Sequence, residues 1–568
     1  MLKIRNYFIV FAVVVAISSA YALVGVQDAK AQAAGSGAAY TDLIKRIEAL
    51  EADAVGNVTA GDITGLKIGF EVRHRFENQV QFPIALGTAS SVSVNSSTLQ
   101  RELSYSYGAG GINNPAERGR RVDNEFTLQR VRLHFDADIN KNVRGFIKLQ
   151  DSRTFGAEQG TAGNLGRTDL LEGYAELRNL GDLNPILTNV GLRVGRWQAS
   201  YGNDRLIGTL NWANQARAYD GGRVRWDNKK NAWIDVFAFQ VQETNTGAAS
   251  GDVGVVTSGA ATASTVTEIG WLPNLLGRRD EVLYGVYSQF KIYAGNVFEP
   301  YFLARAISLE KDVASGTLHG STEQRYTAGF RLDGKDIPGL GGLDYTVEPA
   351  WQFGKVDYAQ ATTTTAFGGL TAKNFTSPIQ AFAIYAGGGY TFKNIPWTPR
   401  IGYAYAFASG DERPTSGSAK TFDHLYPTGH AQLGYIDFIA WQNIKDHQIH
   451  FSIKPTKKLG IDVKGHIFSL DEEADSWYSV AGGTGYGTTA GVNRVGADVF
   501  TDPKTGLTRR VEDDLGQEID LTVSYNLFKN FGVVAGYSHF FADDFIEDTG
   551  AGVDRGSDWA YLQTTLSF

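Results

Sequence analysis

Hydrophobic and polar residues alternate along most of the chain with a period of two. Near the start of this pattern Leu66, Ile68 and Phe70 alternate with Lys67 and Glu71, and the same alternation occurs in residues 130–137, 449–454 and 518–523. Because successive side chains of a strand point to opposite faces, each segment predicts a strand with one apolar face and one charged face.

The alternation predicts eighteen strands that together span almost the whole chain. Most of them run for roughly 10 to 15 residues, which is long enough to cross a bilayer at a tilt. The predicted strands are 66–78, 124–139, 143–154, 169–180, 189–198, 216–226, 231–243, 280–292, 297–311, 324–335, 343–356, 377–392, 399–411, 443–455, 459–472, 512–528, 531–545 and 557–568.

The connections between these strands alternate between short and long. Short turns such as 140–142, 227–230, 456–458 and 529–530 follow the even strands, whereas long loops such as 79–123, 244–279, 412–442 and 473–511 follow the odd ones. A soluble β-sandwich has no such rule, but a transmembrane barrel has short turns at one end and long loops at the other. The sequence therefore predicts an all-β fold: an antiparallel up-and-down transmembrane barrel of about 18 strands.

Both ends of the chain agree with export to the outer membrane. Residues 557–568 end in an aromatic residue and resemble the C-terminal strand by which bacterial outer-membrane proteins are recognised for assembly. At the other end Lys3 and Arg5 precede an apolar stretch at 8–17, and small residues follow at 20–22 and 29–31. This arrangement is typical of a secretory signal peptide, which we place at residues 1–31.

Residues 32–65 form a separate segment between the signal peptide and the barrel, which we place at 66–568. An amphipathic helix is predicted at 39–54, because its apolar residues recur at spacings of three and four: Tyr40, Leu43, Ile47, Leu50 and Ala54. This seam favours either a small trimerising stalk in the periplasm or a lone amphipathic helix or plug. The chain is accordingly expected to be a monomer or a homotrimer.

Composition excludes several classes of protein. The 568 residues include 66 Gly, 26 Tyr, 32 Phe, one Met and no Cys. Beyond the N-terminus no uncharged apolar run approaches the roughly 18 residues of a transmembrane helix. The absence of cysteine excludes disulfides, thiolate metal sites and cysteine nucleophiles. A net charge of −8 disfavours a general nucleic-acid binder.

Two groups of motifs resemble those of the bacterial alginate-export family of outer-membrane proteins. The first runs from Gly195-Arg196-Trp197-Gln198 through residues 201–208, Trp212 and Asn214 to Arg217, 219–221 and Arg223. The second comprises residues 408–411, 421–423, 426–430 and 434–437. The resemblance implies an eighteen-stranded barrel whose narrow, arginine-rich lumen passes a polyanionic uronate polysaccharide.

The alternation itself places a group of cations on the lumen face of the predicted barrel. These residues are Arg73, Arg75, Arg130, Arg132, Lys148, Arg193, Arg223 and Arg225, and Glu71, Asp136, Glu172 and Glu176 share their face. Rings of Arg or Lys are a known device of anion-selective pores, because guanidinium groups bind carboxylates and phosphates. The alternative is that these charges pair across strands and only keep the wall wet and rigid.

Polar residues of the two motifs fall in predicted loops, where they form either a gate folded into the lumen or salt bridges that pin a loop to the wall. Those near strands five and six are Asp204, Arg205, Arg217 and Asp220, and those in the loop after strand thirteen are Asp411, Asp423 and His430, together with Asp437.

Other candidate sites are weak. His447 and His450 lie three apart in a predicted strand, so they point to opposite faces and cannot bind one metal. The glycines of 482–487 lack the strand and helix of a phosphate-binding loop. Acidic residues at 471–473 and 543–544 lie near the external rim, where solvated charge is commoner than a Ca²⁺ or lipopolysaccharide site. We predict no metal or cofactor, and no catalytic group stands out.

The sequence therefore predicts a passive channel in the outer membrane of a diderm bacterium, not an enzyme. Its partners would be outer-membrane lipid, lipopolysaccharide, and small anionic or polar solutes or an anionic polysaccharide. A trimeric general or phosphate-selective porin is the alternative channel, and an outer-membrane enzyme or a structural barrel is the alternative of another class. The sequence identifies neither the transported molecule nor the direction of transport.

Overall fold

A computed structural model describes most of the predicted barrel. The described residues are 64–83, 121–155, 168–245, 278–293, 295–309, 322–335, 339–364, 370–413, 417–478, 480, 491–492, 499–501, 508–510, 512–549 and 556–568. The predicted signal peptide and the predicted helix at 39–54 lie outside these residues and stay predictions.

Eighteen strands form one antiparallel sheet in which neighbours along the chain are neighbours in space. The first nine are β1 (Gly65–Pro83), β2 (Arg121–Asp138), β3 (Val143–Thr154), β4 (Asp169–Leu177), β5 (Val190–Trp197), β6 (Tyr219–Asp227), β7 (Ala232–Asn245), β8 (Arg278–Tyr293) and β9 (Asn296–Leu309). The others are β10 (Thr322–Lys335), β11 (Leu343–Thr364), β12 (Leu370–Thr391), β13 (Arg400–Ala408), β14 (Ile444–Ile453), β15 (Leu459–Ser469), β20 (Asp514–Phe528), β21 (Phe531–Ala542) and β22 (Ser557–Ser567).

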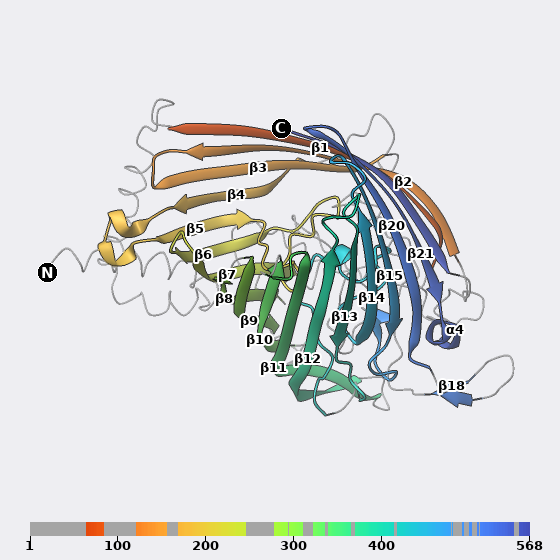
Figure 1. Cartoon of the computed structure of the whole chain (residues 1–568). Helices are drawn as coiled ribbons and strands as arrows, with labels where there is room; N and C mark the ends of the chain where they lie inside the picture. Colours follow the sequence, from red (N-terminus) through yellow and green to blue (C-terminus); the bar gives the residue numbers. More distant parts are fainter. Residues whose placement is uncertain are drawn as a thin grey trace, which may run out of the picture.

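The sheet closes on itself because β1 pairs with both β2 and β22 (Figure 1). At the closing edge the amide of Phe70 donates to the carbonyl of Phe568 at 2.9 Å, and the amide of Phe568 donates back at 3.1 Å. A closed barrel leaves no sheet edge without hydrogen-bonding partners. The predicted fold class, a closed antiparallel barrel of eighteen strands, is confirmed.

Every predicted strand is present, although some bounds differ. The hairpin of β11 and β12 is the largest difference, because its strands extend into the predicted loop 357–376 and leave only 365–369 between them. Its tip is rich in threonine, and β-branched residues favour strands. Four short strands, missed by the sequence, lie in the predicted loop 473–511: β16 (Trp477–Tyr478), β17 (Gly491–Val492), β18 (Val499–Thr501) and β19 (Thr508–Arg510).

Helical structure among the described residues is short. The connection between β4 and β5 contains two 3₁₀ turns, η2 (Leu180–Asp182) and η3 (Pro185–Leu187), so it is longer than the other turns at that end. A third turn, η4 (Gly429–Ala431), lies in the loop after β13, and helix α4 (Asp544–Thr549) follows β21. No helix of the described residues is both long and apolar enough to cross a membrane.

The outer face of the barrel is apolar. Ile449 on β14 is 62% exposed, Ile467 on β15 is 54% exposed and Leu562 on β22 is 50% exposed. Their neighbours along each strand face the interior and are polar, as with His466 and Asp446, both of which are buried. This arrangement of greasy outside and polar inside is that of an outer-membrane barrel.

Two connections fold into the barrel and fill its interior (Figure 1). Loop 198–218 joins β5 to β6, and loop 409–443, of which 414–416 lie outside the described residues, joins β13 to β14. Side chains of both loops, such as Ile207 and Phe422, belong to one buried hydrophobic cluster with inward-facing residues of the wall, such as Phe239.

The inner wall is covered at this level around its full circumference. Each of the eighteen strands contributes at least one inward-facing side chain that is almost fully buried: Arg73, Arg130, Gln150, Glu172, Trp197, Tyr219, Phe239, Leu283, Leu303, Thr327, Ala350, Ala383, Ala406, Asp446, His466, Asp520, Ser538 and Trp559. The two loops therefore narrow the lumen to whatever passage lies between or beside them.

Candidate functional site

The two inner loops bind each other through backbone hydrogen bonds. The amide of Gly208 donates to the carbonyl of Tyr426 at 2.8 Å, and the amide of Tyr426 donates to Leu206 at 2.9 Å. The amide of Thr428 donates to the carbonyl of Asp204 at 2.8 Å, and the Thr428 hydroxyl donates to the Asp204 carboxylate at 3.0 Å. We call this contact between residues 204–210 and 426–428 the seam, because it joins two loops that are anchored on different parts of the wall.

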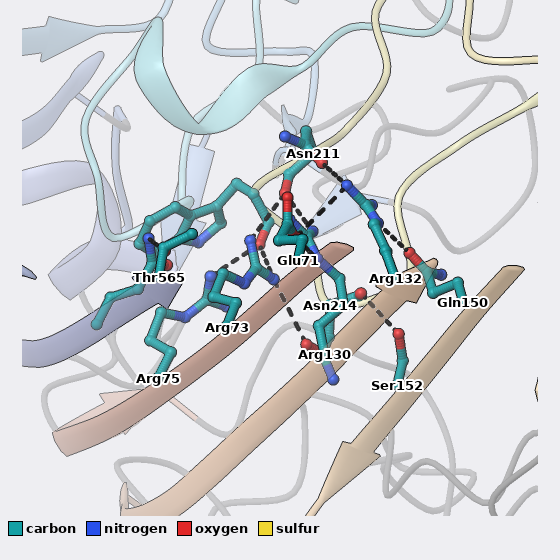
Figure 2. Close-up of polar contacts among 12 residues, drawn as sticks. Glu71, Arg73, Arg75, Arg130, Arg132, Gln150, Ser152, Asn211, Asn214 and Thr565 are labelled. Atoms are coloured by element: carbon teal, nitrogen blue, oxygen red, sulfur yellow. Dashed lines mark hydrogen bonds and ion pairs between the residues drawn. The ribbon is translucent and has the colours of Figure 1, made fainter. Parts of the chain in front are cut away.

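Loop 198–218 is anchored on β1 by arginine side chains that bind its backbone (Figure 2). Arg73 donates to the carbonyls of Asn211 at 3.0 Å, Trp212 at 3.2 Å and Ala213 at 3.1 Å. Arg75 donates to the Trp212 carbonyl at 2.8 Å, and its guanidinium lies 3.9 Å from the centre of the Trp212 ring. Both guanidinium groups are thus occupied by the loop.

The arginines of β2 bind the same part of the loop. Arg130 donates to the Asn211 carbonyl at 2.9 Å and to Glu71 at 2.7 Å. Arg132 donates to the Asn211 side chain at 2.9 Å and to Gln150 at 2.8 Å. The structure therefore brings four of the predicted lumen arginines together, with their donors turned to the loop.

The end of this anchor reaches β3. The side chain of Asn214 donates to the carbonyls of Gln129 at 3.1 Å and Arg153 at 3.2 Å, and Ser152 donates to the Asn214 carbonyl at 2.8 Å. Loop 198–218 is therefore bound to three consecutive strands of the wall.

Loop 409–443 is anchored on the other side, on β9, β10 and β11. Asp423 accepts hydrogen bonds from Arg305 on β9, and the Arg305 guanidinium also binds Glu323 on β10 at 2.7 Å. Arg325 donates to Glu323 at 2.9 Å, and Gln352 on β11 donates to the Asp423 carbonyl at 2.7 Å. All five side chains are at most 5% exposed, so this network is closed to solvent.

Four further residues predicted as gate or pinning groups bind other parts of the protein. Arg205 donates to Glu348 at 2.9 Å, with its guanidinium 3.5 Å from the centre of the Tyr385 ring. Arg217 donates to the Pro427 carbonyl at 3.1 Å. Asp220 is exposed, faces outward and pairs with Arg196 at 2.5 Å.

His430 lies in a stack of rings between the two loops. Its ring centre lies 3.9 Å from that of Trp212, the ring planes differ by 5°, and its Nδ1 lies 3.0 Å from the Asp437 carboxylate. The Trp212 ring belongs to loop 198–218, so this stack joins the two loops beside the seam.

Asp411 caps the start of loop 409–443. Its carboxylate accepts hydrogen bonds from the amides of Arg413 at 2.9 Å and Lys420 at 3.2 Å. With Asp204 in the seam, every predicted gate or pinning residue except Asp220 lies in the contacts of the two loops. Whether these contacts open as a gate stays a prediction.

The other predicted lumen cations lie on β3, β5 and β6 and pair with carboxylates. Lys148 binds Glu172, Arg193 binds Glu176, and Arg225 binds Asp235 through two bonds of 2.5 and 2.6 Å. Their side chains are partly exposed, at 19%, 15% and 32%. This group therefore faces the lumen at the short-turn side of the loops.

Sequence reasoning missed several inward-facing cations. Arg144 on β3 binds Asp136 through two bonds of 2.6 and 2.9 Å, and Arg400 on β13 binds Asp344 through two bonds of 2.8 and 2.6 Å. Arg305 and Arg325, which hold loop 409–443, were also missed. The period-two alternation contained the signal, because each residue is in phase with an apolar outward face.

The two histidines of β14 point to opposite faces, as predicted. Tyr403 lies against His447 on the outer face at 2.6 Å, whereas His450 contacts Arg400 at 2.7 Å and Asp462 at 2.9 Å on the inner face. No group of three or more histidine or carboxylate side chains among the described residues could hold a metal ion.

A family model described as alginate export matches residues 109–252 and 277–557, which together make up well over half of the chain. The chain belongs to the alginate export family. This family and the closed barrel place it in the outer membrane of a Gram-negative bacterium and make it an outer-membrane channel, which is not a class of enzymes. The short turns of this alginate-export barrel then lie in the periplasm and the long loops outside the cell.

Solved structures from Pseudomonas aeruginosa are similar over most of their length. OccK8 (OprE) is 10% identical with a TM-score of 0.46, and the match covers 90% of this chain and 99% of that chain. OpdQ is 12% identical with a TM-score of 0.45 and the same two coverages. OccK11 (OpdR) is 12% identical with a TM-score of 0.43, covering 89% and 96%. No curated protein matches the chain.

Two buried groups in the loops of this alginate-export family member have shifted pKa values of opposite sense. Burial lowers the pKa of His424 in loop 409–443 to about 4, although the neighbouring Asp423 carboxylate opposes this effect. Burial raises the pKa of Asp475, in the loop after β15, to about 6, although Thr421 and Tyr478 donate hydrogen bonds to it.

These shifts predict opposite pH dependences that cancel in the unaltered protein. Because the folded pKa of His424 is below its unfolded value, its stabilisation is lost as the pH falls from 6.5 to 4; that of Asp475 is lost as the pH rises from 4 to 6. Each effect amounts to roughly 3 kcal/mol, at about 1.4 kcal/mol for each unit of pKa shift.

The test is the free energy of unfolding in urea at pH 4 and at pH 6.5. Asp475→Asn should be less stable at the acidic pH, and His424→Gln should be less stable at the neutral pH. Flat profiles in both variants would contradict the assignment of these two groups.

Proposed function

We propose that the protein is a passive channel for anionic or polar solutes, including anionic polysaccharide, and that arginines of its inner wall give it a preference for anions. Membership of the alginate export family supports the transport of an anionic polymer. The arrangement of the inner wall supports the anion preference, as argued next.

The observation that carries this proposal is the row of partly exposed arginines on the periplasmic side of the two loops. Arg144, Arg193, Arg223 and Arg225 come from β3, β5 and β6, and between 12% and 32% of each side chain remains exposed. By contrast Arg73, Arg75, Arg130 and Arg132 are spent on loop 198–218. We therefore assign solute contact to the first set and loop positioning to the second.

Exposed guanidinium groups in a narrow lumen act on anions in two ways. Their field is focused by the low-dielectric wall, which raises the local concentration of anions. Their planar fork replaces part of the hydration shell of a carboxylate, and the neighbouring Glu176 and Asp235 keep each contact weak enough to release. Movement would be diffusion down a gradient through several such contacts.

The test is the reversal potential of the protein in a planar bilayer under a KCl gradient. We expect chloride to be preferred over potassium, and the double variant Arg193→Ala, Arg225→Ala to reverse this preference, because Glu176 and Asp235 lose their partners. Arg196→Ala is the matched control, since Arg196 faces outward. Unchanged selectivity in the double variant would remove the proposed role of these arginines. A protein without conductance would favour a structural barrel or an enzyme.

Oligomeric state remains a proposal of its own. A helix at 39–54 would suit a trimer, as would a general or phosphate-selective porin. Deletion of residues 39–54 should convert a trimer to a monomer, as measured by the mass of the detergent-solubilised protein. An unchanged mass would remove the stalk from consideration.

A further inference from the structure

Arg223 occupies the centre of a cluster of charged side chains on the inner face of β5, β6 and β7. It lies directly opposite Arg193 in the pairing of β5 with β6, and Arg225 is two residues further along its own strand. The nearest carboxylate oxygens belong to Asp235, at 3.6 Å, and Glu176, at 3.9 Å. Both distances are too long for hydrogen bonds.

Arg223 differs from the other arginines of the lumen in its hydrogen bonding. Within the described strands and inner loops, every other inward-facing arginine donates at least one hydrogen bond to a carboxylate, a carbonyl or an amide oxygen. Arg223 donates none there, and its Nε is buried without a partner. A guanidinium has five N–H donors, and a buried one without an acceptor is unfavourable.

The neighbouring carboxylates are not available to Arg223, because other donors already bind them. Asp235 accepts two bonds from Arg225 at 2.5 and 2.6 Å and a third from the Tyr201 hydroxyl at 3.0 Å. Glu176 accepts bonds from Arg193 at 2.8 Å and from Arg178 at 3.4 Å. The acceptor that Arg223 lacks must therefore come from outside the wall.

The charge of the cluster indicates what kind of acceptor fits. Three guanidinium groups, Arg193, Arg223 and Arg225, face two carboxylates, Glu176 and Asp235, which leaves one net positive charge. A single carboxylate would neutralise it, whereas a dianionic phosphate would be repelled by the two resident carboxylates. A guanidinium fork also matches the two oxygens of a carboxylate.

We propose that Arg223 is the binding site for one carboxylate group of a solute in the periplasmic half of the lumen. The site lies between Tyr219, whose hydroxyl donates to the Gly208 carbonyl of loop 198–218 at 3.2 Å, and the turn that follows Asp227. With 12% of its side chain exposed, Arg223 can be reached from the lumen. The inference rests on the proposed function, because it requires that anionic solutes enter this channel.

The test is saturation-transfer NMR of small sugars with the mature protein in detergent micelles, a binding measurement that does not depend on flux. Galacturonate is the monocarboxylate probe, galactose is the uncharged probe and galactose 6-phosphate is the dianionic probe. We expect a dissociation constant for galacturonate that Arg223→Gln raises about tenfold, the effect of losing one charge-assisted hydrogen bond. Arg223→Lys should lie between the two, and Arg196→Gln should match the unaltered protein.

Three results would overturn the proposal: equal binding of galactose and galacturonate, tighter binding of the phosphate, or unchanged galacturonate binding in Arg223→Gln. Heat-dependent mobility on a gel checks that each variant folds, and Arg223→Lys, which keeps the charge, serves as the test if Arg223→Gln does not fold. If the bilayer experiment shows an anion-preferring channel while Arg223→Gln still binds galacturonate, this inference fails and the proposed function stands. If galacturonate binds through Arg223 but no current flows, the proposed function fails instead.

Discussion

Replacing Asp423 by alanine should detach loop 409–443 from the barrel wall and raise the single-channel conductance several-fold. Asp423 is the group of this loop that binds Arg305, and its carbonyl accepts from Gln352 on the neighbouring strand. Removing one partner of a buried ion pair typically costs about 3–5 kcal/mol, because the remaining charge is left buried without compensation. Arg305 and Arg325 would then share Glu323 alone.

The measurement is the conductance in planar bilayers, with the unfolding free energy in urea as a second readout. Asp423→Asn keeps the shape of the side chain and should have a smaller effect. Asp182→Ala is the matched control, because Asp182 pairs with Lys141 at 2.9 Å in an exposed periplasmic turn, where ion pairs contribute little. Equal conductance in Asp423→Ala and the unaltered protein would show that the buried network does not hold the loop in place.

The double variant Arg73→Ala, Arg130→Ala should release loop 198–218. Together these side chains bind the carbonyls of Asn211, Trp212 and Ala213. Each hydrogen bond from a charged donor contributes about 1.5–3 kcal/mol, so their joint loss exceeds what the remaining contacts of Arg75 and Arg132 supply. We expect rapid current fluctuations and new trypsin cleavage after Arg205 and Arg217, which lie in this loop.

The matched control for this variant is Arg178→Ala. Arg178 lies at the periplasmic rim, is 38% exposed and pairs with Asp138 at 2.9 Å. This control should keep both the quiet current and the resistance to trypsin. A double variant that loses anion preference but stays quiet and uncut would instead return Arg73 and Arg130 to the solute path, as the sequence had suggested.

The strands of this barrel could be predicted because lipid contact imposes a simple rule. Outward residues such as Ile449 and Ile467 must be apolar over a whole strand, while inward ones need not be. The ends of β11 and β12 could not be predicted, because beyond the membrane the rule no longer applies. The polar threonines there were read as a loop, although they continue the ladder as far as the pairing of Thr364 with Leu370.

The candidate site was predictable only in part, for a similar reason. Strand phase indicates that Arg73 and Arg130 face the interior, but not what they meet there. Their partners are backbone carbonyls of Asn211 and Ala213, and any residue has such a carbonyl. The sequence of a loop therefore carries no mark of being held in this way. The same holds for Asp423, whose arginine partner lies 118 positions away on another strand.

The seam between the two inner loops also bears on the order of assembly. Asp204 and Thr428, which meet there, are 224 positions apart in the sequence, and contacts of such separation form late because the chain between them must first be closed into a loop. The barrel therefore has to insert and zip up around an interior that is still wet. Its wall must stand on neighbouring-strand pairing alone until the two connections meet across the middle.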